Sequence, residues 1–447
     1  MFVFISYIIF GSILRRELKG GGPYIPVLTQ LSKVVVFLSE IPHNLKYMKS
    51  HDMRNPNQTR ENRFGSLSGF IGDTNEKEKY LLLSRFDGDM EESVVELIDL
   101  QSFDVLHTWN PDINSFFEKV DKVEGGEWEY LIRDKNENRF SLLHPILIED
   151  GSLLFQNSSP LIKIDKNSEL EWMKDDEVYH HSIEEDKQGS FWVCVQYYPY
   201  KIDKKYVGDK FDYYMDDGLR KISSTGEILF DKSVSEIFIE NGMEYLLFSV
   251  GDQVFTRDPI HLNDIQPVEK DTKYWKKGDV FLSLRHQSMI LLYRPKTNEI
   301  IWKSTWEFYH QHDVDILDDS RISIFVNNSK NTFSGDIVDG NNRVVIYDFE
   351  TEKYSYYLNE SLKKEDVRTT TDGRSEILNN NDLFIEETTY GRILYFNSDG
   401  SLRWTHINRA NDGNVYYVSW SRILYENEDI QKVHRFLKIK NEITYNE

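Results

Sequence analysis

The chain has 447 residues, and its 75 acidic against 53 basic side chains give a formal net charge of −22 at pH 7. The sequence has no compensating basic block, which argues against nucleic acid or an anionic membrane surface as the main partner, because both require clustered positive charge. Aromatic residues make up 14% of the chain, more than a disordered protein carries, and the single cysteine, Cys194, excludes an intrachain disulfide and a cysteine-based metal site.

The first fourteen residues are almost wholly apolar and are followed at once by Arg15 and Arg16. This stretch is shorter than the roughly 20 residues that a spanning helix needs, and it lacks the basic start and cleavage site of a signal peptide. We interpret residues 1–19 as a truncated membrane anchor or signal segment. The two arginines would lie in the cytoplasm by the positive-inside rule, which conflicts with an exported body and leaves the orientation open. Residues 20–63 are predicted to be a linker with a possible helix at 25–49.

One unit recurs from residue 64 onward: an alternating strand, a tight polar turn and a short strand that usually ends in an aromatic residue. Its six copies end at Trp109, Trp172, Phe230, Trp302, Tyr356 and Trp404. Most copies have a further β-rich segment ahead of them, and helical periodicity is nearly absent between residues 64 and 425. Six such repeats predict an all-β protein, a six-bladed β-propeller over residues 64–425, with the terminal aromatic residues packed between blades.

The closure of the ring is left open by the sequence. Either the segment from Tyr416 to Tyr425 or a strand near Phe70 could complete the last blade. Residues 426–447 are rich in charge and are predicted to form a tail or a short helix.

Several histidines occupy the same place in the repeat, where an inner strand begins. They are His180 and His181, His261, His286 beside Arg285, and His310 and His312. Inner strands of all blades line the central channel of a propeller, so side chains at equivalent positions converge on one axis. The repeat therefore predicts a histidine cluster at an axial funnel.

Two kinds of site suit converging histidines with an arginine. A metal site would combine neutral imidazoles with oxygen ligands from Asp264 or Asp313. The guanidinium of Arg285 would repel a cation, whereas it matches the oxygens of a phosphoryl or sulfuryl group through two parallel hydrogen bonds. We therefore favour an anion-handling site without a metal. The sequence has no P-loop, dinucleotide fingerprint or nucleophile elbow, so we also expect no nucleotide cofactor.

Three motifs, in this order and after His180, resemble those of the arylsulfotransferase family, the bacterial arylsulfate sulfotransferases that do not use phosphoadenosine phosphosulfate. The motifs are His261-Leu262-Asn263-Asp264-Ile265, Leu284-Arg285-His286-Gln287 and Gln311-His312-Asp313. Asp264 and Leu284 each stand where the family usually has serine, and neither change removes a group expected to do chemistry. The resemblance covers roughly residues 64–425, and the family fold is a six-bladed propeller.

The resemblance implies an enzyme that moves a sulfuryl group from an aryl sulfate ester to an acceptor alcohol or phenol. It implies that His312 forms a sulfohistidine intermediate, that Arg285 and His261 stabilise the sulfuryl oxygens, and that His181 completes the clamp or protonates the leaving oxygen. Other residues expected to bind substrate are His180, Asn263, His286 and His310. The family also implies a periplasmic protein, or one anchored in a membrane and facing the periplasm.

Two alternatives remain open from the sequence. A non-catalytic propeller could keep the funnel as a binding or scaffold protein, and a sulfate-ester hydrolase could use the same pocket with water as the acceptor. Trp306, Phe308 and Tyr309 could form an apolar wall for a phenolic ring, although ordinary strand packing is the favoured interpretation. Arg392 flanks an outer hairpin and is expected at the surface.

Overall fold

The computed structural model describes Gly11 and residues 55–59, 61–120, 136–207, 214–248, 255–306, 308–332 and 335–444. The predicted anchor at 1–19, apart from Gly11, and the predicted helix at 25–49 lie outside these residues. Within the described ranges, no helix is both long and apolar enough to cross a bilayer.

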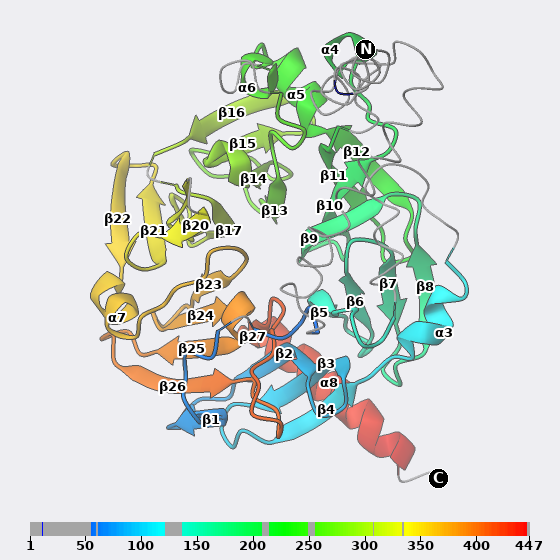
Figure 1. Ribbon diagram of the computed structural model, residues 1–447, viewed down its shortest axis with the longest axis vertical. Helices are drawn as coiled ribbons and strands as arrows, with labels where there is room; N and C mark the ends of the chain where they lie inside the picture. The colour runs from blue at the N-terminus through cyan, green and yellow to red at the C-terminus, as the bar shows by residue number, and fades with distance from the viewer. Residues whose placement is uncertain are drawn as a thin grey trace, which may run out of the picture. The chain divides into compact units, whose positions relative to one another are not determined.

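Six antiparallel four-stranded sheets surround a common centre (Figure 1), which confirms the six-bladed propeller. From the inner to the outer edge, blade 1 consists of β27 (Arg422–Leu424), β2 (Tyr80–Asp87), β3 (Glu92–Asp99) and β4 (Val105–Trp109); blade 2 of β5 (Leu143–Leu147), β6 (Leu153–Gln156), β7 (Leu161–Ile164) and β8 (Leu170–Lys174); and blade 3 of β9 (Val178–Glu185), β10 (Phe191–Tyr197), β11 (Asp216–Ile222) and β12 (Ile228–Ser233). Blade 4 consists of β13 (Leu262–Pro267), β14 (Val280–Leu284), β15 (Met289–Arg294) and β16 (Glu299–Ser304); blade 5 of β17 (Gln311–Ile316), β18 (Arg321–Val326), β21 (Arg343–Asp348) and β22 (Lys353–Tyr357); and blade 6 of β23 (Arg374–Ile377), β24 (Leu383–Glu387), β25 (Arg392–Phe396) and β26 (Leu402–Ile407).

Shorter elements connect or cover the blades. They are β1 (Gly69–Gly72), the hairpin of β19 (Ser329–Thr332) and β20 (Gly335–Val338), the α-helices α3 (Ile113–Phe117), α4 (Lys204–Val207), α5 (Val234–Glu240), α6 (Tyr245–Phe248), α7 (Asn359–Lys364) and α8 (Asn427–Thr444), and the 3₁₀ turns η2 (Arg285–Gln287) and η3 (Thr388–Tyr390). The predicted turn-containing hairpins are the two outer strands of each blade.

Two chain segments close the ring, and both are ones that the sequence left open. β27 provides the innermost strand of blade 1 by pairing with β2. β1 pairs with β26 and adds a fifth, outermost strand to blade 6. The beginning and the end of the propeller are therefore joined by two separate sets of backbone hydrogen bonds.

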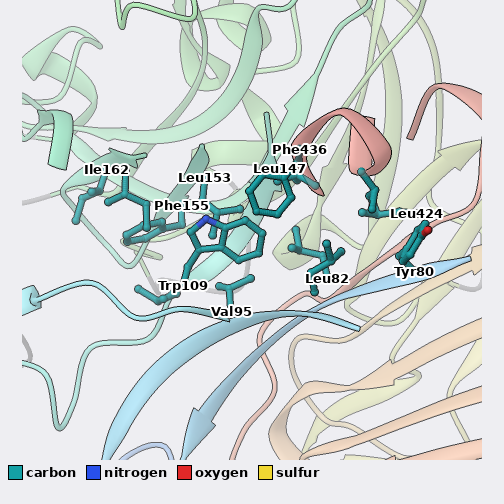
Figure 2. Close-up of a cluster of buried hydrophobic side chains, with 14 of the residues drawn as sticks. Tyr80, Leu82, Val95, Trp109, Leu147, Leu153, Phe155, Ile162, Leu424 and Phe436 are labelled. Carbon is teal, nitrogen blue, oxygen red and sulfur yellow. The ribbon is translucent and has the colours of Figure 1, made fainter. Parts of the chain in front are cut away.

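Aromatic residues at the ends of five repeats pack in core clusters between blades, as predicted, whereas Tyr356 is 43% exposed. Figure 2 shows the cluster at the boundary of blades 1 and 2, where Trp109 lies fully buried among Val95, Leu153 and Phe155. The indole Nε1 of Trp109 donates a hydrogen bond to the carbonyl of Gly151 over 3.0 Å. The blade boundary therefore depends on one large side chain for both packing and a hydrogen bond.

The charged C-terminal segment is a helix, α8, that docks on this same cluster. Val433 and Phe436 of α8 are fully buried, and the Phe436 ring stacks on Trp109 with centroids 5.5 Å apart. The buried apolar residues of the helix cover the blade boundary, and Lys432 of the helix donates to the Leu147 carbonyl over 3.0 Å.

We expect Trp109→Ala to lower the free energy of unfolding by about 3–5 kcal/mol, because it leaves a cavity between two blades and removes a buried hydrogen bond. Urea unfolding followed by circular dichroism measures the loss. Trp306→Ala is the matched control, since Trp306 is 42% exposed and stacks on Tyr354 alone among the aromatic rings described. Equal losses in the two variants would contradict this role for Trp109.

Candidate active site

Each blade has a residue with positive φ either within its inner strand or one to two residues before it. These residues are His144 (53°), His181 (53°), His261 (54°), His310 (55°), Asp372 (55°) and Trp420 (61°). The left-handed conformation is uncommon outside glycine, so its repetition in all six blades marks a shared structural feature. Strand register shifts at this point in blades 2 to 5, as in a β-bulge, and a bulge redirects the neighbouring side chains.

These positions at the inner strands bring most of the predicted histidines together. The Nε2 atoms of His181 and His261 are 3.2 Å apart, and the ring of His312 lies 6.2 Å from that of His181. His286 stacks on His261 with centroids 4.3 Å apart, and His310 lies 6.3 Å beyond His286. The repeat position thus predicted the convergence.

His144 belongs to the same cluster and is absent from the predicted site. Its ring lies 6.4 Å from His181 and 4.3 Å from Trp420. Burial and the nearby cations Arg422 and Arg374 lower its pKa well below the usual value, so the ring is neutral. The sequence signal for His144 was its position in the inner strand of blade 2, which corresponds to that of His181 in blade 3.

His312 is held in one tautomer. The side-chain nitrogen of Asn327 donates to the carbonyls of Thr369 and Asp372 over 3.1 and 2.7 Å, so the amide oxygen must face His312. That oxygen lies 2.6 Å from Nδ1 of His312 and therefore accepts its proton. The amide of Asp372 donates to Nε2 over 3.1 Å, which requires a lone pair there. Nε2 is thus the unprotonated nitrogen.

His312 is also kept neutral by its surroundings. The residue is 1% exposed, and burial followed by the charge of Arg285 lowers its pKa well below the usual value. An imidazole in this state keeps its nucleophilic lone pair even in mildly acidic solution.

His261 has the opposite electrostatic character because of Asp258, a residue absent from the predicted site. Nδ1 of His261 lies 2.7 Å from the carboxylate of Asp258. Burial opposes protonation of His261, but the hydrogen bond and charge of Asp258 outweigh it and raise the pKa. The pKa of the neighbouring His181 is lowered well below its usual value by burial and by the surrounding histidines. Of the two rings that share this contact, His261 therefore takes a proton more readily than His181.

Asp258 also holds His286, whose Nδ1 donates to the Asp258 backbone carbonyl over 2.8 Å. One side-chain nitrogen or oxygen from each of Asp258, His261 and His286 could bind a metal, and these three atoms lie within 4.8 Å of one another. Hydrogen bonds already account for this arrangement, and Arg285 adds positive charge beside it.

Arg285 lies at the edge of the cluster on η2, directly after β14. Its backbone amide donates to the carbonyl of His261 over 3.0 Å, which places the turn beside that histidine. The residue is 8% exposed, and within the described ranges its Nε atom has no hydrogen-bond partner. A buried guanidinium with an unused donor suits an anionic ligand.

The remaining predicted residues have protein partners. Asn263 donates through its side chain to the carbonyl of Gln311 over 2.8 Å, which joins β13 to β17. Nε2 of His180 lies 3.4 Å from the carboxylate of Asp217, and Nδ1 of His310 lies 3.1 Å from Ser329 Oγ. Burial and Arg285 lower the pKa of His310 to about 4.

Asp264 and Asp313, considered as metal ligands from the sequence, connect blades instead. Asp264 accepts the backbone amide of Val314 and Asp313 accepts that of Ser375, each over 2.9 Å. Each carboxylate therefore joins one inner strand to the next. The serine-to-aspartate departure at Asp264 adds a bond between blades 4 and 5.

A cavity of about 320 Å³ borders the histidine cluster. Its lining includes His144, His180, His181, Asp372, Tyr417 and Trp420. Trp306, Phe308 and Tyr309 are absent from this lining; Phe308 is buried in a core cluster, which agrees with strand packing. The apolar surface next to the cluster comes from Trp420 and Tyr417, just before β27.

Two solved structures are only weakly similar to this chain. A protein of unknown function from Bacteroides caccae is 11% identical and has a TM-score of 0.48, with 77% of this chain and 98% of that chain covered. The WD40 domain of Neurospora crassa Pan2 is 10% identical and has a TM-score of 0.40, with 79% and 89% covered. The six-bladed propeller is established by the strand order of the sheets.

Comparison with protein families and curated proteins gives a more specific result. No curated protein matches the chain. The family model described as Arylsulfotransferase (ASST) matches residues 144–409, from the first histidine of the cluster to the segment after β26. This range contains His312, His261, Arg285 and His181 on the blades described above. The chain therefore belongs to the arylsulfotransferase family.

Proposed function

We propose that this protein transfers a sulfuryl group from an aryl sulfate ester to a phenol or alcohol through a covalent intermediate on His312. One observation carries the proposal: a buried, neutral histidine presents the lone pair of Nε2 beside a protonated histidine and a guanidinium. His312 can therefore act as the nucleophile, while His261 and Arg285 provide positive charge for the sulfuryl oxygens.

In the first step, Nε2 of His312 releases the hydrogen bond from the Asp372 amide and attacks sulfur with the freed lone pair, and the bond from sulfur to the aryl oxygen breaks. The bonding electron pair goes to the aryl oxygen, and the pair formed by His261 and His181 supplies a proton to it. The proton on Nδ1 of His312 stays on that nitrogen, which donates it in a hydrogen bond to Asn327. The products are a free phenol and a sulfuryl group on His312.

In the second step, the hydroxyl oxygen of an acceptor attacks the same sulfur. The bond from sulfur to Nε2 breaks, and its electron pair returns to His312. The acceptor's proton restores the pair of His261 and His181, so the enzyme ends in its starting state. A single site therefore serves donor and acceptor in turn.

Arg285 and His261 stabilise the charge that spreads over the nonbridging sulfuryl oxygens. A low-dielectric site makes such contacts stronger than in water, and fixed donors need no reorganisation during the reaction. The cavity lined by Trp420 and Tyr417 is the place for the aromatic ring, since it borders His181 and Asp372.

Intact-mass measurement after brief mixing with a chromogenic aryl sulfate tests the proposal. The expected result is one sulfuryl adduct, mapped to His312 under mildly basic conditions and discharged when a phenol is added. Discharge by water at the same rate without phenol would favour a hydrolase. No adduct and no phenol release with several donors would favour a binding protein.

Asp258→Asn should narrow the pH range of activity from the alkaline side. Loss of the carboxylate charge lowers the pKa of His261, so its cationic form disappears at lower pH. We expect the alkaline limb of kcat/KM to move down by about 1–2 pH units. The acid limb, which reports protonation of His312, should change little.

The matched control for this change is Asp279→Asn, which alters a buried carboxylate of the same blade that pairs with Arg294. An alkaline limb that stays in place in Asp258→Asn, or moves equally in both variants, would contradict the role of His261.

A further inference from the structure

The loop from Glu365 to Asp372 joins α7 to β23 and ends on the nucleophile. The Asp372 amide donates to Nε2 of His312 over 3.1 Å. The Asp372 carbonyl accepts from the side chain of Asn327, which itself accepts the proton on Nδ1 of His312. Both nitrogens of His312 therefore depend on where this loop lies.

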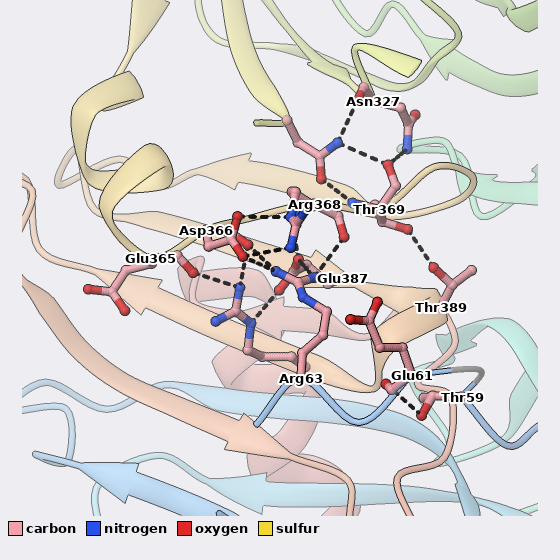
Figure 3. A network of polar contacts seen from close by, with 12 residues as sticks. Thr59, Glu61, Arg63, Asn327, Glu365, Asp366, Arg368, Thr369, Glu387 and Thr389 are labelled. Atoms are coloured by element: carbon pink, nitrogen blue, oxygen red, sulfur yellow. Dashed lines mark hydrogen bonds and ion pairs between the residues drawn. The ribbon is translucent and has the colours of Figure 1, made fainter. Parts of the chain in front are cut away.

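The other end of the loop is held by Arg63, which precedes the first blade in sequence (Figure 3). Nη1 of Arg63 donates to the carbonyl of Arg368 over 3.0 Å, and Nη2 donates to the backbone carbonyl and carboxylate of Asp366, the carboxylate at 3.1 Å. Only 6% of the Arg63 side chain is exposed, whereas the Asp366 side chain is 58% exposed, so the buried guanidinium reaches from the interior to the surface end of the loop.

Glu387, at the end of β24, completes the attachment. Its carboxylate is fully buried and binds Nη1 of Arg63 at 3.0 Å, the backbone amide of Arg368, and Nε of Arg392. Arg392 in turn donates to the carbonyl of Glu365 over 3.0 Å. Arg392, expected at the surface from the sequence, is therefore buried, because it serves this attachment.

Thr369 links the two ends of the loop. Its carbonyl accepts from Asn327 over 3.1 Å, and its hydroxyl lies 2.7 Å from that of Thr389 on η3. Figure 3 shows two groups of contacts, one around Arg63, Asp366 and Glu387 and the other around Thr369 and Asn327, and the chain from Arg368 to Thr369 joins them. Hydrogen bonds and the peptide bond between Arg368 and Thr369 thus connect the segment before the propeller to Asn327, the residue that orients His312.

We infer that Arg63 is a positioning residue for the nucleophile: it fixes the loop that presents the Asp372 amide to Nε2 of His312. The kinetic part of this inference rests on the proposed function. When a sulfuryl group occupies Nε2, the same amide is within reach of a sulfuryl oxygen and acts as a fixed donor to it.

Loosening the loop should raise the pKa of His312, which a general loss of stability would not do. The Asp372 amide binds the neutral form of His312, so weakening this bond favours protonation and raises the pKa. The other charged or titratable groups around His312 lie outside the loop and stay in place; they are Arg285, His261, His181, His144 and His310. The Asp372 carboxyl belongs to the loop and moves with it. A hydrogen bond worth about 0.5–1.5 kcal/mol corresponds to about 0.5–1 pH unit.

The test compares Arg63→Gln with Arg409→Gln in the full chain. Arg409 holds the same N-terminal segment, through the Leu67 carbonyl at 2.7 Å and Asn62 Oδ1 at 2.8 Å, without touching the loop. In Arg63→Gln we expect adduct formation on His312 to slow about 10–100-fold, with KM for the aryl sulfate nearly unchanged. The acid limb should move up by about 0.5–1 pH unit, and Arg63→Lys should recover part of the rate.

Two results would overturn the inference: equal adduct rates and acid limbs in Arg63→Gln and Arg409→Gln, or equal hydrogen exchange at residues 365–373 in the two variants. If the wild-type protein forms no adduct, the proposed function fails. The positioning role is then decided by hydrogen exchange and by NMR titration of His312, neither of which needs turnover.

Discussion

His312→Asn is expected to reduce turnover of an aryl sulfate by at least about 10³-fold and to abolish the covalent adduct. Asparagine occupies similar space and keeps a polar group near Asn327, but it offers no nucleophilic nitrogen to sulfur. Stopped-flow release of a chromogenic phenol and intact-mass analysis measure the two effects. The buried position of His312 inside a hydrogen-bonded network makes folding the first property to verify, by thermal unfolding.

His406→Asn is the matched control for this variant. His406 is 7% exposed in β26, and its pKa is lowered to about 3 by burial and by Arg85, so it is another buried neutral histidine. It lies in an outer strand of blade 6, so its loss should leave turnover within about twofold of wild type. An adduct that persists in His312→Asn would place the nucleophile elsewhere.

Arg285→Lys is expected to lower kcat/KM by about 10²–10³-fold, although the positive charge is kept. A guanidinium offers two parallel donors to a sulfuryl group, whereas an ammonium acts as a single point charge. Arg285 has an unused Nε donor within the described residues, so its change should affect the transition state more than the fold. Steady-state kinetics with one donor and a saturating phenol measure the loss.

Arg294→Lys serves as the control, because Arg294 forms a two-pronged ion pair with Asp279 on the same blade. Its replacement should alter stability slightly and leave kcat/KM near the wild-type value. Comparable kinetic losses in both variants would mean that Arg285 acts through the structure of blade 4 and not on the sulfuryl group.

The architecture was predictable because its signals are local. Period-2 alternation, polar turns and terminal aromatic residues recur within each repeat, and each repeat folds as one blade. The histidine convergence followed from the same logic, since equivalent positions of a propeller meet at its axis. His144 could have been included on that ground, whereas the closure by both β1 and β27 depends on pairing across the whole chain.

The sequence by itself determined the propeller, the family motifs and the set of histidines, because each of these is written in short, repeated patterns. The tertiary structure alone decided which histidine is neutral, which is charged and which nitrogen is free. Those properties depend on Asn327, Asp258 and Asp372; Asp372 meets His312 across 60 residues of chain. Protonation follows burial and neighbouring charge, and no periodic pattern encodes which distant amide or carboxylate lies beside a given ring.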